Sequence, residues 1–337
     1  MVPAVFGLSG LTLTADERAF FRDADPAGYI LFGRNVETRE QVRALTDALR
    51  EIHGRERLFV CIDQEGGRVA RMKPPVWPAY PAGAAFDSLY ELAPATAIEA
   101  ARLNAQALGL DLAEAGITVD CHPSLDVRHE GAHDVIGDRA LGFEPLRVAA
   151  LGRAILDGFA RAGVVGCIKH MPGHGRAGAD SHKELPTVEA PAAELEQDLA
   201  PFRALANAPV GMSAHVRYTA WDAERPATLS PVVVGEVIRG AIGFDGLLLT
   251  DDLDMEALSG SVPQRAERAI AAGCDIALNC WAKMDDMVGI ARALPAIGAR
   301  AAQRLEKALA SVDPAGAGGD HAELIARRDA LMAQRAA

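Results

Sequence analysis

The stretch PLRVAALGRAILDGFARAGVVGCIKH, residues 145–170, contains one complete helix-to-strand unit. Apolar residues recur every three to four positions through its first part, which is typical of an amphipathic helix. Gly163 ends this pattern, as glycine often does at a helix C-terminus. The run Val164–Ile168 that follows is almost continuously apolar. Such a run indicates a strand that is covered on both faces, as strands of parallel sheets are.

The same unit recurs along the chain. Near-continuous apolar runs occupy residues 3–7, 28–33, 58–63, 117–123, 164–170, 209–216, 247–252 and 274–280, and helix patterns separate them. Eight strand–helix units predict an α/β fold with a single (β/α)8 barrel of the TIM type over residues 1–311. A doubly wound open sheet is the rival, but no glycine-rich phosphate turn follows the first strand. The segment DPAGAGGD and the polar stretch after it predict a linker and a C-terminal helix packed on the barrel, residues 312–337.

Composition narrows the classes of partner. The chain has 337 residues, half of them hydrophobic, and a net charge of −12, which repels phosphate backbones and disfavours nucleic acid. No apolar stretch reaches the ~20 residues of a membrane span, and no signal-peptide pattern opens the sequence. The five cysteines lie mostly within apolar runs, which predicts buried free thiols in a reducing compartment. We therefore expect a monomeric cytoplasmic protein without membrane contact.

Polar residues mark the ends of five predicted strands. In a barrel of this kind the C-terminal strand ends share one rim, and active sites lie there. A carboxylate at a strand end suits either the nucleophile of a glycosidase or a metal ligand. In chain order the residues are Asp63, Asp126, Lys169 with His170, His215, and Asp251 with Asp252.

The segment KHMPGHGRAGADSHKELP, residues 169–186, raises the question of a metal. Its His170, His174, Asp180 and His182 are residue types that ligate metal ions, and His215 could join them. Against this, His170 and His174 flank a Pro-Gly pair and do not share a helix face. No His-x-His follows the first or second strand either. We expect neither a metal nor another cofactor, and a metal-dependent barrel hydrolase stays the alternative.

Six segments of the chain together resemble those of a known family. They are CIDQEGGRVARM (61–72), IGDRALG (136–142), KHMPGHG (169–175), ADSHKELP (179–186), MSAHV (212–216) and LLLTDDLDM (247–255). The bacterial β-N-acetylglucosaminidases of glycoside hydrolase family 3, which act in peptidoglycan recycling, have similar segments in the same order over nearly the whole chain. This sequence departs from them in small ways: it has Met171 where the family often has Phe, Thr250 where Ser is common, and Asp254 where Ser or Asn is usual.

The resemblance implies catalytic roles. Asp251 matches the nucleophile, which forms a glycosyl-enzyme intermediate in a retaining reaction. Asp252 is the competing carboxylate, but strand alternation predicts that it points to the other side. His182 matches the acid/base, and Asp180 matches the carboxylate that orients it. A nearby carboxylate favours the charged imidazole and raises its pKa, which suits general acid catalysis near neutrality.

The resemblance also implies a sugar-binding set and a substrate. Hydroxyl and N-acetyl groups need charged partners held rigidly, and Asp63, Arg71, Arg139, Lys169 and His170 match those of the family. The implied substrate is a muropeptide fragment with a terminal, non-reducing β-linked N-acetylglucosamine. Three readings stay open: the metal-dependent hydrolase, a phosphorylase in which phosphate accepts the sugar, and a non-catalytic sugar-binding barrel. His174 and His215 receive no assigned role.

Overall fold

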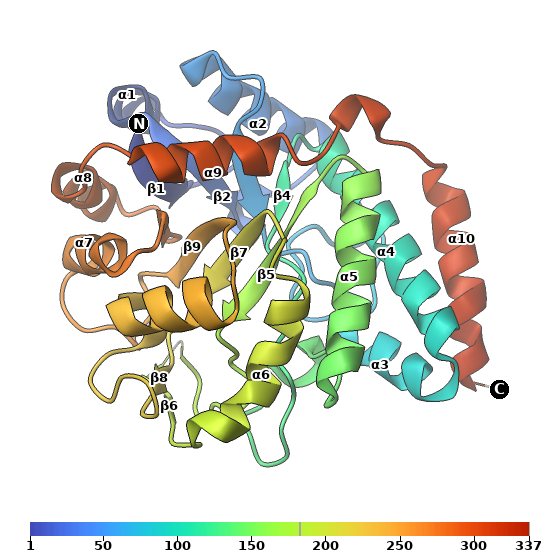
Figure 1. Cartoon of the computed structure of the whole chain (residues 1–337). Coiled ribbons are helices and arrows are strands. Elements are labelled where there is room, and N and C mark those ends of the chain that lie inside the picture. The colour runs from blue at the N-terminus through green and yellow to red at the C-terminus, as the bar shows by residue number, and fades with distance from the viewer. Residues whose placement is uncertain (182, 337) are drawn as a thin grey trace.

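The computed structural model describes residues 1–181 and 183–336. Eight parallel strands close into a barrel, and helices surround it (Figure 1). Each predicted apolar run overlaps one of these strands, so the predicted (β/α)8 barrel is confirmed. In their order around the barrel the strands are β1 (Val2–Gly7), β10 (Ile276–Asn279), β9 (Leu247–Asp252), β7 (Val210–Ser213), β5 (Val165–Met171), β4 (Val119–Asp120), β3 (Phe59–Ile62) and β2 (Pro26–Leu31).

Helices follow the strands, and local sequence signals begin and end them. Thr14 and Glu17 form a capping box at the start of α1, and Ser261 and Gln264 form another at the start of α7. Gly54 ends α2 in the left-handed region, with φ 60°. The sequence did not predict α3. The helices around the strands are α1 (Ala15–Ala24), α2 (Arg39–His53), α3 (Gly83–Leu92), α4 (Pro94–Glu114), α5 (Pro145–Arg161), α6 (Ala192–Ala204), the π-helical segment η4 (Val233–Ala241), α7 (Val262–Ala272) and α8 (Met284–Ala293).

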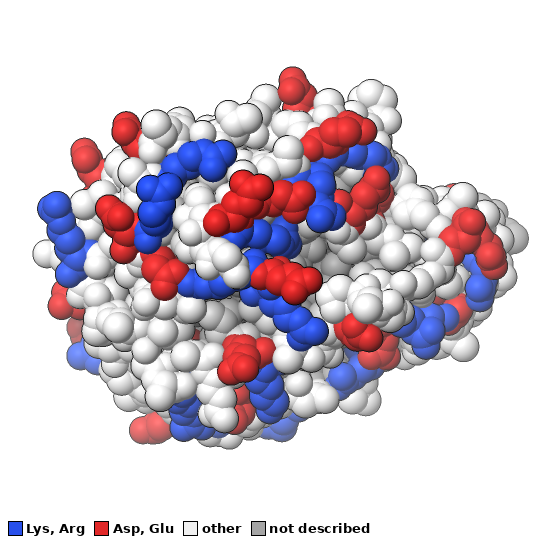
Figure 2. Space-filling view, turned by 90° about the horizontal axis from the view of Figure 1, so that it is seen from above, with Lys and Arg blue, Asp and Glu red and all other residues white. Residues whose placement is uncertain are grey.

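The core has two parts, as the alternation of strand side chains requires. Leu247 and Leu249 of β9 point into the barrel, whereas Leu248 packs in the shell between strands and helices. Helix α9 (Ala299–Leu309) adds Leu305 and Ala308 to the inner cluster. It thereby closes the end of the barrel opposite the strand C-termini, at the top of Figure 1. Figure 2 views the molecule from that side, where acidic and basic side chains are intermingled.

The chain end lies outside the barrel. Helix α10 (His321–Met332) runs beside α4 (Figure 1), and Arg328 donates a hydrogen bond of 2.8 Å to Asn104 of α4. His321 lies 3.2 Å from Asp111 of α4. Among the described residues, no helix is long and apolar enough to cross a membrane. All five cysteines are described, and they are buried free thiols as the sequence predicts.

Candidate active site

Two strands carry an extra residue near their C-terminal ends. Ile168 of β5 pairs with Gly211 of β7, but the next registered pair is Met171 with Ser213, so β5 holds one residue more than its neighbour. The pairing of β9 with β10 shifts in the same way. A bulge of this kind interrupts the alternation of side chains and re-aims them. Consecutive residues of β5 and of β9 therefore face one cavity.

The strand C-termini surround a cavity of about 850 Å³. This volume lies in the upper part of the ~300–1,000 Å³ range of small-molecule sites. The predicted His182 lies outside the described residues. Every other predicted site residue lines the cavity, namely Asp63, Arg71, Arg139, Lys169, His170, Asp180 and Asp251.

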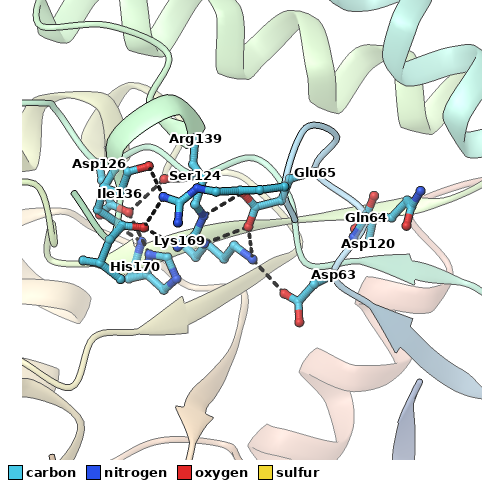
Figure 3. A network of polar contacts seen from close by, with 12 residues as sticks. Asp63, Gln64, Glu65, Asp120, Ser124, Asp126, Ile136, Arg139, Lys169 and His170 are labelled. Atoms are coloured by element: carbon cyan, nitrogen blue, oxygen red, sulfur yellow. Dashed lines mark hydrogen bonds and ion pairs between the residues drawn. The ribbon is translucent and has the colours of Figure 1, made fainter. Parts of the chain in front are cut away.

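Asp63, Glu65, Lys169 and Arg139 form what we call the ion-pair cradle (Figure 3). The buried Lys169 ammonium lies 2.8 Å from Asp63 Oδ1 and 2.7 Å from Glu65 Oε1. Arg139 donates to both oxygens of Glu65, at 2.8 and 2.9 Å. Arg71 reaches the second oxygen of Asp63 at 3.3 Å. Each carboxylate is thus held by two cations, which fixes the orientation of all the charged groups.

The opposite charges in the cradle keep one another ionised. Burial alone would raise the pKa of Asp63, but Lys169 and Arg71 outweigh it and lower that pKa. Burial opposes ionisation of Glu65 too, yet Arg139 and Lys169 hold its pKa well below the usual range. Burial would lower the pKa of Lys169, but Asp63 and Glu65 raise it. The cradle therefore presents ionised donors and acceptors across the neutral pH range.

A second buried carboxylate orients the histidine of β5. Asp126 Oδ2 lies 2.7 Å from His170 Nδ1 and accepts a hydrogen bond from Ser124 at 2.8 Å. The backbone N–H groups of His170 and His174 donate to the other oxygen of Asp126. With Nδ1 engaged, the ring of His170 is fixed where it lines the cavity. Asp126 thus ties the start of the histidine-rich segment to the loop after β4.

The end of β9 presents two carboxylates. The Asp252 N–H donates to Asp251 Oδ1 at 2.8 Å, and both residues line the cavity. The expectation that alternation turns Asp252 away is therefore wrong, because the bulge in β9 breaks the alternation. Burial and then the neighbouring Asp254 raise the pKa of Asp252 to about 7. Asp252 is thus partly protonated near neutral pH, which weakens it as an anionic nucleophile.

His215 supports this strand end. Its Nε2 donates to the Asp252 carbonyl oxygen at 2.9 Å, and its Nδ1 lies 2.9 Å from Thr228 Oγ1. Burial lowers the pKa of His215, so the neutral ring is favoured. These contacts give His215 a structural role, because they fix the backbone beside Asp251.

The loop after β5 is anchored at its base to α6. Arg176 donates to Asp198 Oδ2 at 2.7 Å, and His129 Nε2, from the loop after β4, lies 2.9 Å from Asp198 Oδ1. The two loops also join directly, since the His133 N–H donates to the Ala177 carbonyl. Farther along, His174 Nε2 lies 3.1 Å from Ser181 Oγ. These contacts bring Asp180 to the cavity.

Sequence reasoning missed the role of Glu65. Its signal is the pair Gly66-Gly67 that follows it, both with positive φ (94° and 55°). A Cβ at Gly66 would lie 2.3 Å from the Pro81 carbonyl oxygen, so the turn there requires glycine. Glu65 stands directly before this turn, and its Oε1 lies 2.7 Å from Lys169 Nζ.

The described part of the site contains no group of three or more His, Cys, Asp or Glu side chains arranged to hold a metal ion. The end of β9 places carboxylates beside a set of fixed, charged donors and acceptors. The donors and acceptors can bind a polyhydroxylated ring, and a carboxylate can attack one of its carbons. The arrangement supports glycosyl transfer from a bound sugar.

Comparison with known proteins decides the family. Residues 6–313 match the family described as "Glycosyl hydrolase family 3 N terminal domain". The chain belongs to glycosyl hydrolase family 3. It is therefore a glycoside hydrolase, as its sequence segments suggested.

β-Hexosaminidases and a solved structure are similar to this chain over most or all of its length. The chain is 38% identical to the β-hexosaminidase of Bordetella pertussis over 289 residues, and this match covers 84% of this chain and 81% of that protein. It is 38% identical over 313 residues to the β-hexosaminidase of Chromobacterium violaceum, covering 90% and 86%. The crystal structure of NagZ from Neisseria gonorrhoeae with N-trifluoroacetyl-D-glucosamine superposes with a TM-score of 0.88 at 30% identity, covering 100% of this chain and 98% of that one.

Proposed function

We propose that the protein is a retaining exo-β-N-acetylglucosaminidase that releases terminal, non-reducing β-linked N-acetylglucosamine from muropeptide fragments in the cytoplasm, during cell-wall recycling. The observation that carries the proposal is that Asp251 lines the same cavity as Asp63, Lys169 and Arg139 of the ion-pair cradle. The β-hexosaminidase relatives, and the N-acylated glucosamine bound by the Neisseria protein, support the sugar.

The proposed reaction has two steps. The Asp251 carboxylate attacks the anomeric carbon, the bond from that carbon to the leaving oxygen breaks, and His182 gives its proton to that oxygen. Water then attacks the glycosyl-enzyme while His182 takes a proton back, and Asp251 is released. Asp180 orients His182 and favours its charged form. Two inversions at one carbon give overall retention.

The cradle and the neighbouring Arg71 supply sugar binding and specificity. Asp63 can accept hydrogen bonds from sugar hydroxyls. Lys169, Arg71 and Arg139 can donate hydrogen bonds to sugar oxygens. Their charges are already neutralised and oriented within the fold, so binding requires little rearrangement. A sugar that lacks the acetamido group would leave buried polar groups unpaired, which lowers turnover strongly.

One experiment tests the proposal. The protein is incubated with an aryl β-N-acetylglucosaminide and with the matching β-glucoside, each with and without phosphate, and the product is identified. We expect the acetamido sugar to be strongly preferred and free N-acetylglucosamine to be the product in both buffers. Equal rates on the two sugars would contradict the substrate assignment, and a sugar 1-phosphate product would show a phosphorylase. Loss of activity on dialysis against a chelator, restored by zinc, would support the metal-dependent alternative.

A further inference from the structure

Trp281 follows β10 directly and stands at the rim of the cavity. Its side chain is 61% exposed, whereas Trp77 is 4% exposed. Leaving a large aromatic ring in water forgoes the stabilisation that burial would give, so an exposed ring at a site mouth points to a binding role. Trp281 also belongs to the lining of the active-site cavity, together with Asp251 of the neighbouring strand.

The backbone around Trp281 is held in place. Asp254 Oδ2 accepts hydrogen bonds from the Trp281 and Cys280 N–H groups, both at 3.3 Å, and from the Asn279 side-chain amide at 2.6 Å. Ala282, the next residue, has φ 56°, a conformation that non-glycine residues seldom adopt. Backbone strain of this kind persists where the surrounding structure imposes it, and it often marks a functional site.

The position of Trp281 defines which part of a substrate it meets. The ion-pair cradle comes from β3, β5 and the loop after β4, whereas Trp281 follows β10, which neighbours β9 and its Asp251. The leaving group is attached to the carbon that Asp251 attacks. In-line displacement places the leaving group on the face of that carbon opposite Asp251. Because the terminal sugar is held at the cradle, whose Lys169 is buried, the rest of the substrate extends toward solvent, past the exposed edge of the cavity where Trp281 lies. A cavity of about 850 Å³ has room for more than one sugar ring.

We propose that Trp281 forms the platform on which the sugar ring of the leaving group stacks. The inference rests on the proposed function. One face of a pyranose presents mainly C–H bonds, and an indole ring offers a flat apolar surface of matching size. Lys283 Nζ lies 5.9 Å from the centre of the indole ring, and this cation–π contact limits the motion of both side chains. Trp281 thus sets the preference for a ring-bearing leaving group.

The test compares leaving groups of different size in Trp281→Ala and Trp281→Phe. The substrates are N-acetyl-β-glucosaminyl fluoride, whose leaving group has no ring, and a β-linked disaccharide with the same N-acetylglucosamine. For Trp281→Ala we expect the loss in kcat/KM on the disaccharide to exceed that on the fluoride by roughly 10- to 100-fold. Trp281→Phe keeps a flat ring and should recover most of the difference. Leu146→Ala, at an 82% exposed residue outside the cavity, is the matched control.

A binding readout separates this inference from the proposed function. In the Asp251→Ala background, the disaccharide should protect tryptophan fluorescence from iodide quenching, and Trp281→Phe should abolish that protection. N-acetylglucosamine alone should protect much less. Equal losses on both substrates, or protection that persists in Trp281→Phe, would overturn the inference. Failure of the unaltered protein to cleave either substrate would instead overturn the proposed function.

Discussion

The ion-pair cradle and the loop after β5 serve the same cavity, yet they are held in different ways. Glu65 and Lys169 of the cradle are buried, and each of its carboxylates meets two cations. The loop is anchored to α6, where Arg176 and His129 meet Asp198. This difference fits the division of roles that we propose: the cradle binds a sugar whose position must not change, and the loop supplies a proton.

The largest effect is expected at the strand end that faces the cradle. Asp251→Ala removes the proposed nucleophile, so turnover of every substrate should fall by roughly 10⁴-fold or more. A slow fluorinated N-acetylglucosaminide should label Asp251 covalently in the unaltered protein, and mass spectrometry of the digested protein locates the label.

Asp252→Asn is the control for this prediction, because Asp252 lines the same cavity and carries a raised pKa. The asparagine keeps the acceptor oxygen that the Asp254 and Cys280 N–H groups use. We expect a much smaller loss than for Asp251→Ala. A label found on Asp252 would reverse the assignment of the two carboxylates.

The loop should show a different signature, namely dependence on the leaving group. A sugar alkoxide needs a proton to depart, whereas an aryl group of low pKa does not. His182→Ala should therefore lower turnover of a disaccharide by ~10²–10⁴-fold and turnover of an activated aryl glycoside far less. Parallel kinetics on the two substrates measure the ratio of the losses.

Asp180→Ala sharpens this prediction. In the proposed mechanism Asp180 orients the imidazole without transferring the proton, so the same pattern should appear more weakly. The pH profile should also shift to lower pH, because the imidazole loses the charge that raises its pKa. A ratio of losses near one for His182→Ala would indicate a structural histidine and refute the acid/base role.

The two regions also differ in how far the sequence could predict them. Asp63, Lys169 and Asp251 end apolar runs, and barrel geometry alone gathers such ends on one rim. Glu65 was missed and the orientation of Asp252 was wrongly predicted, both for local reasons. Glu65 stands directly before a Gly-Gly turn, and a bulge in β9 turns Asp252 toward the cavity. Neither feature can be predicted from the spacing of hydrophobic residues. The sequence did not predict the role of Asp198, because Asp198 lies in α6, away in sequence from the loop that it anchors.

The cradle should matter for stability as well as for binding. In Glu65→Gln a buried partner of Lys169 and Arg139 loses its charge, which we expect to lower the free energy of unfolding at pH 7 by ~3–5 kcal/mol. Urea unfolding measures the change. Glu99→Gln removes one partner of the helix-surface pair with Arg102, and it should cost only ~0–1 kcal/mol.

The stability effect of Glu65→Gln should depend on pH, and its direction follows from the pKa shift of Glu65. The folded state lowers the pKa of Glu65 from the ordinary value of 4.5. Its stabilisation is therefore complete above pH 4.5 and is lost as pH falls through the lower folded pKa. The difference between the unaltered protein and Glu65→Gln should shrink from pH 7 to pH 3. A difference that stays constant over this range would contradict the assignment of the stabilisation to the Glu65 charge.

The smallest effect is expected at the anchor of the loop. Asp198→Asn keeps the size of the side chain but removes the charge that pairs with Arg176 and His129. Charge-assisted hydrogen bonds of this kind contribute ~1.5–3 kcal/mol to stability. We expect only part of this loss to change the position of the proton donor, because Asp198 lies at the base of the loop. Turnover of a disaccharide should fall about tenfold, with a smaller fall for the activated aryl glycoside and little change in KM. Glu196→Gln, on the exposed face of the same helix, is the matched control.

If Asp198 merely stabilised α6, activity on both substrates would fall equally. The leaving-group ratio of Asp198→Asn therefore decides whether the anchor acts through the loop, and a ratio near one would remove Asp198 from the catalytic arrangement.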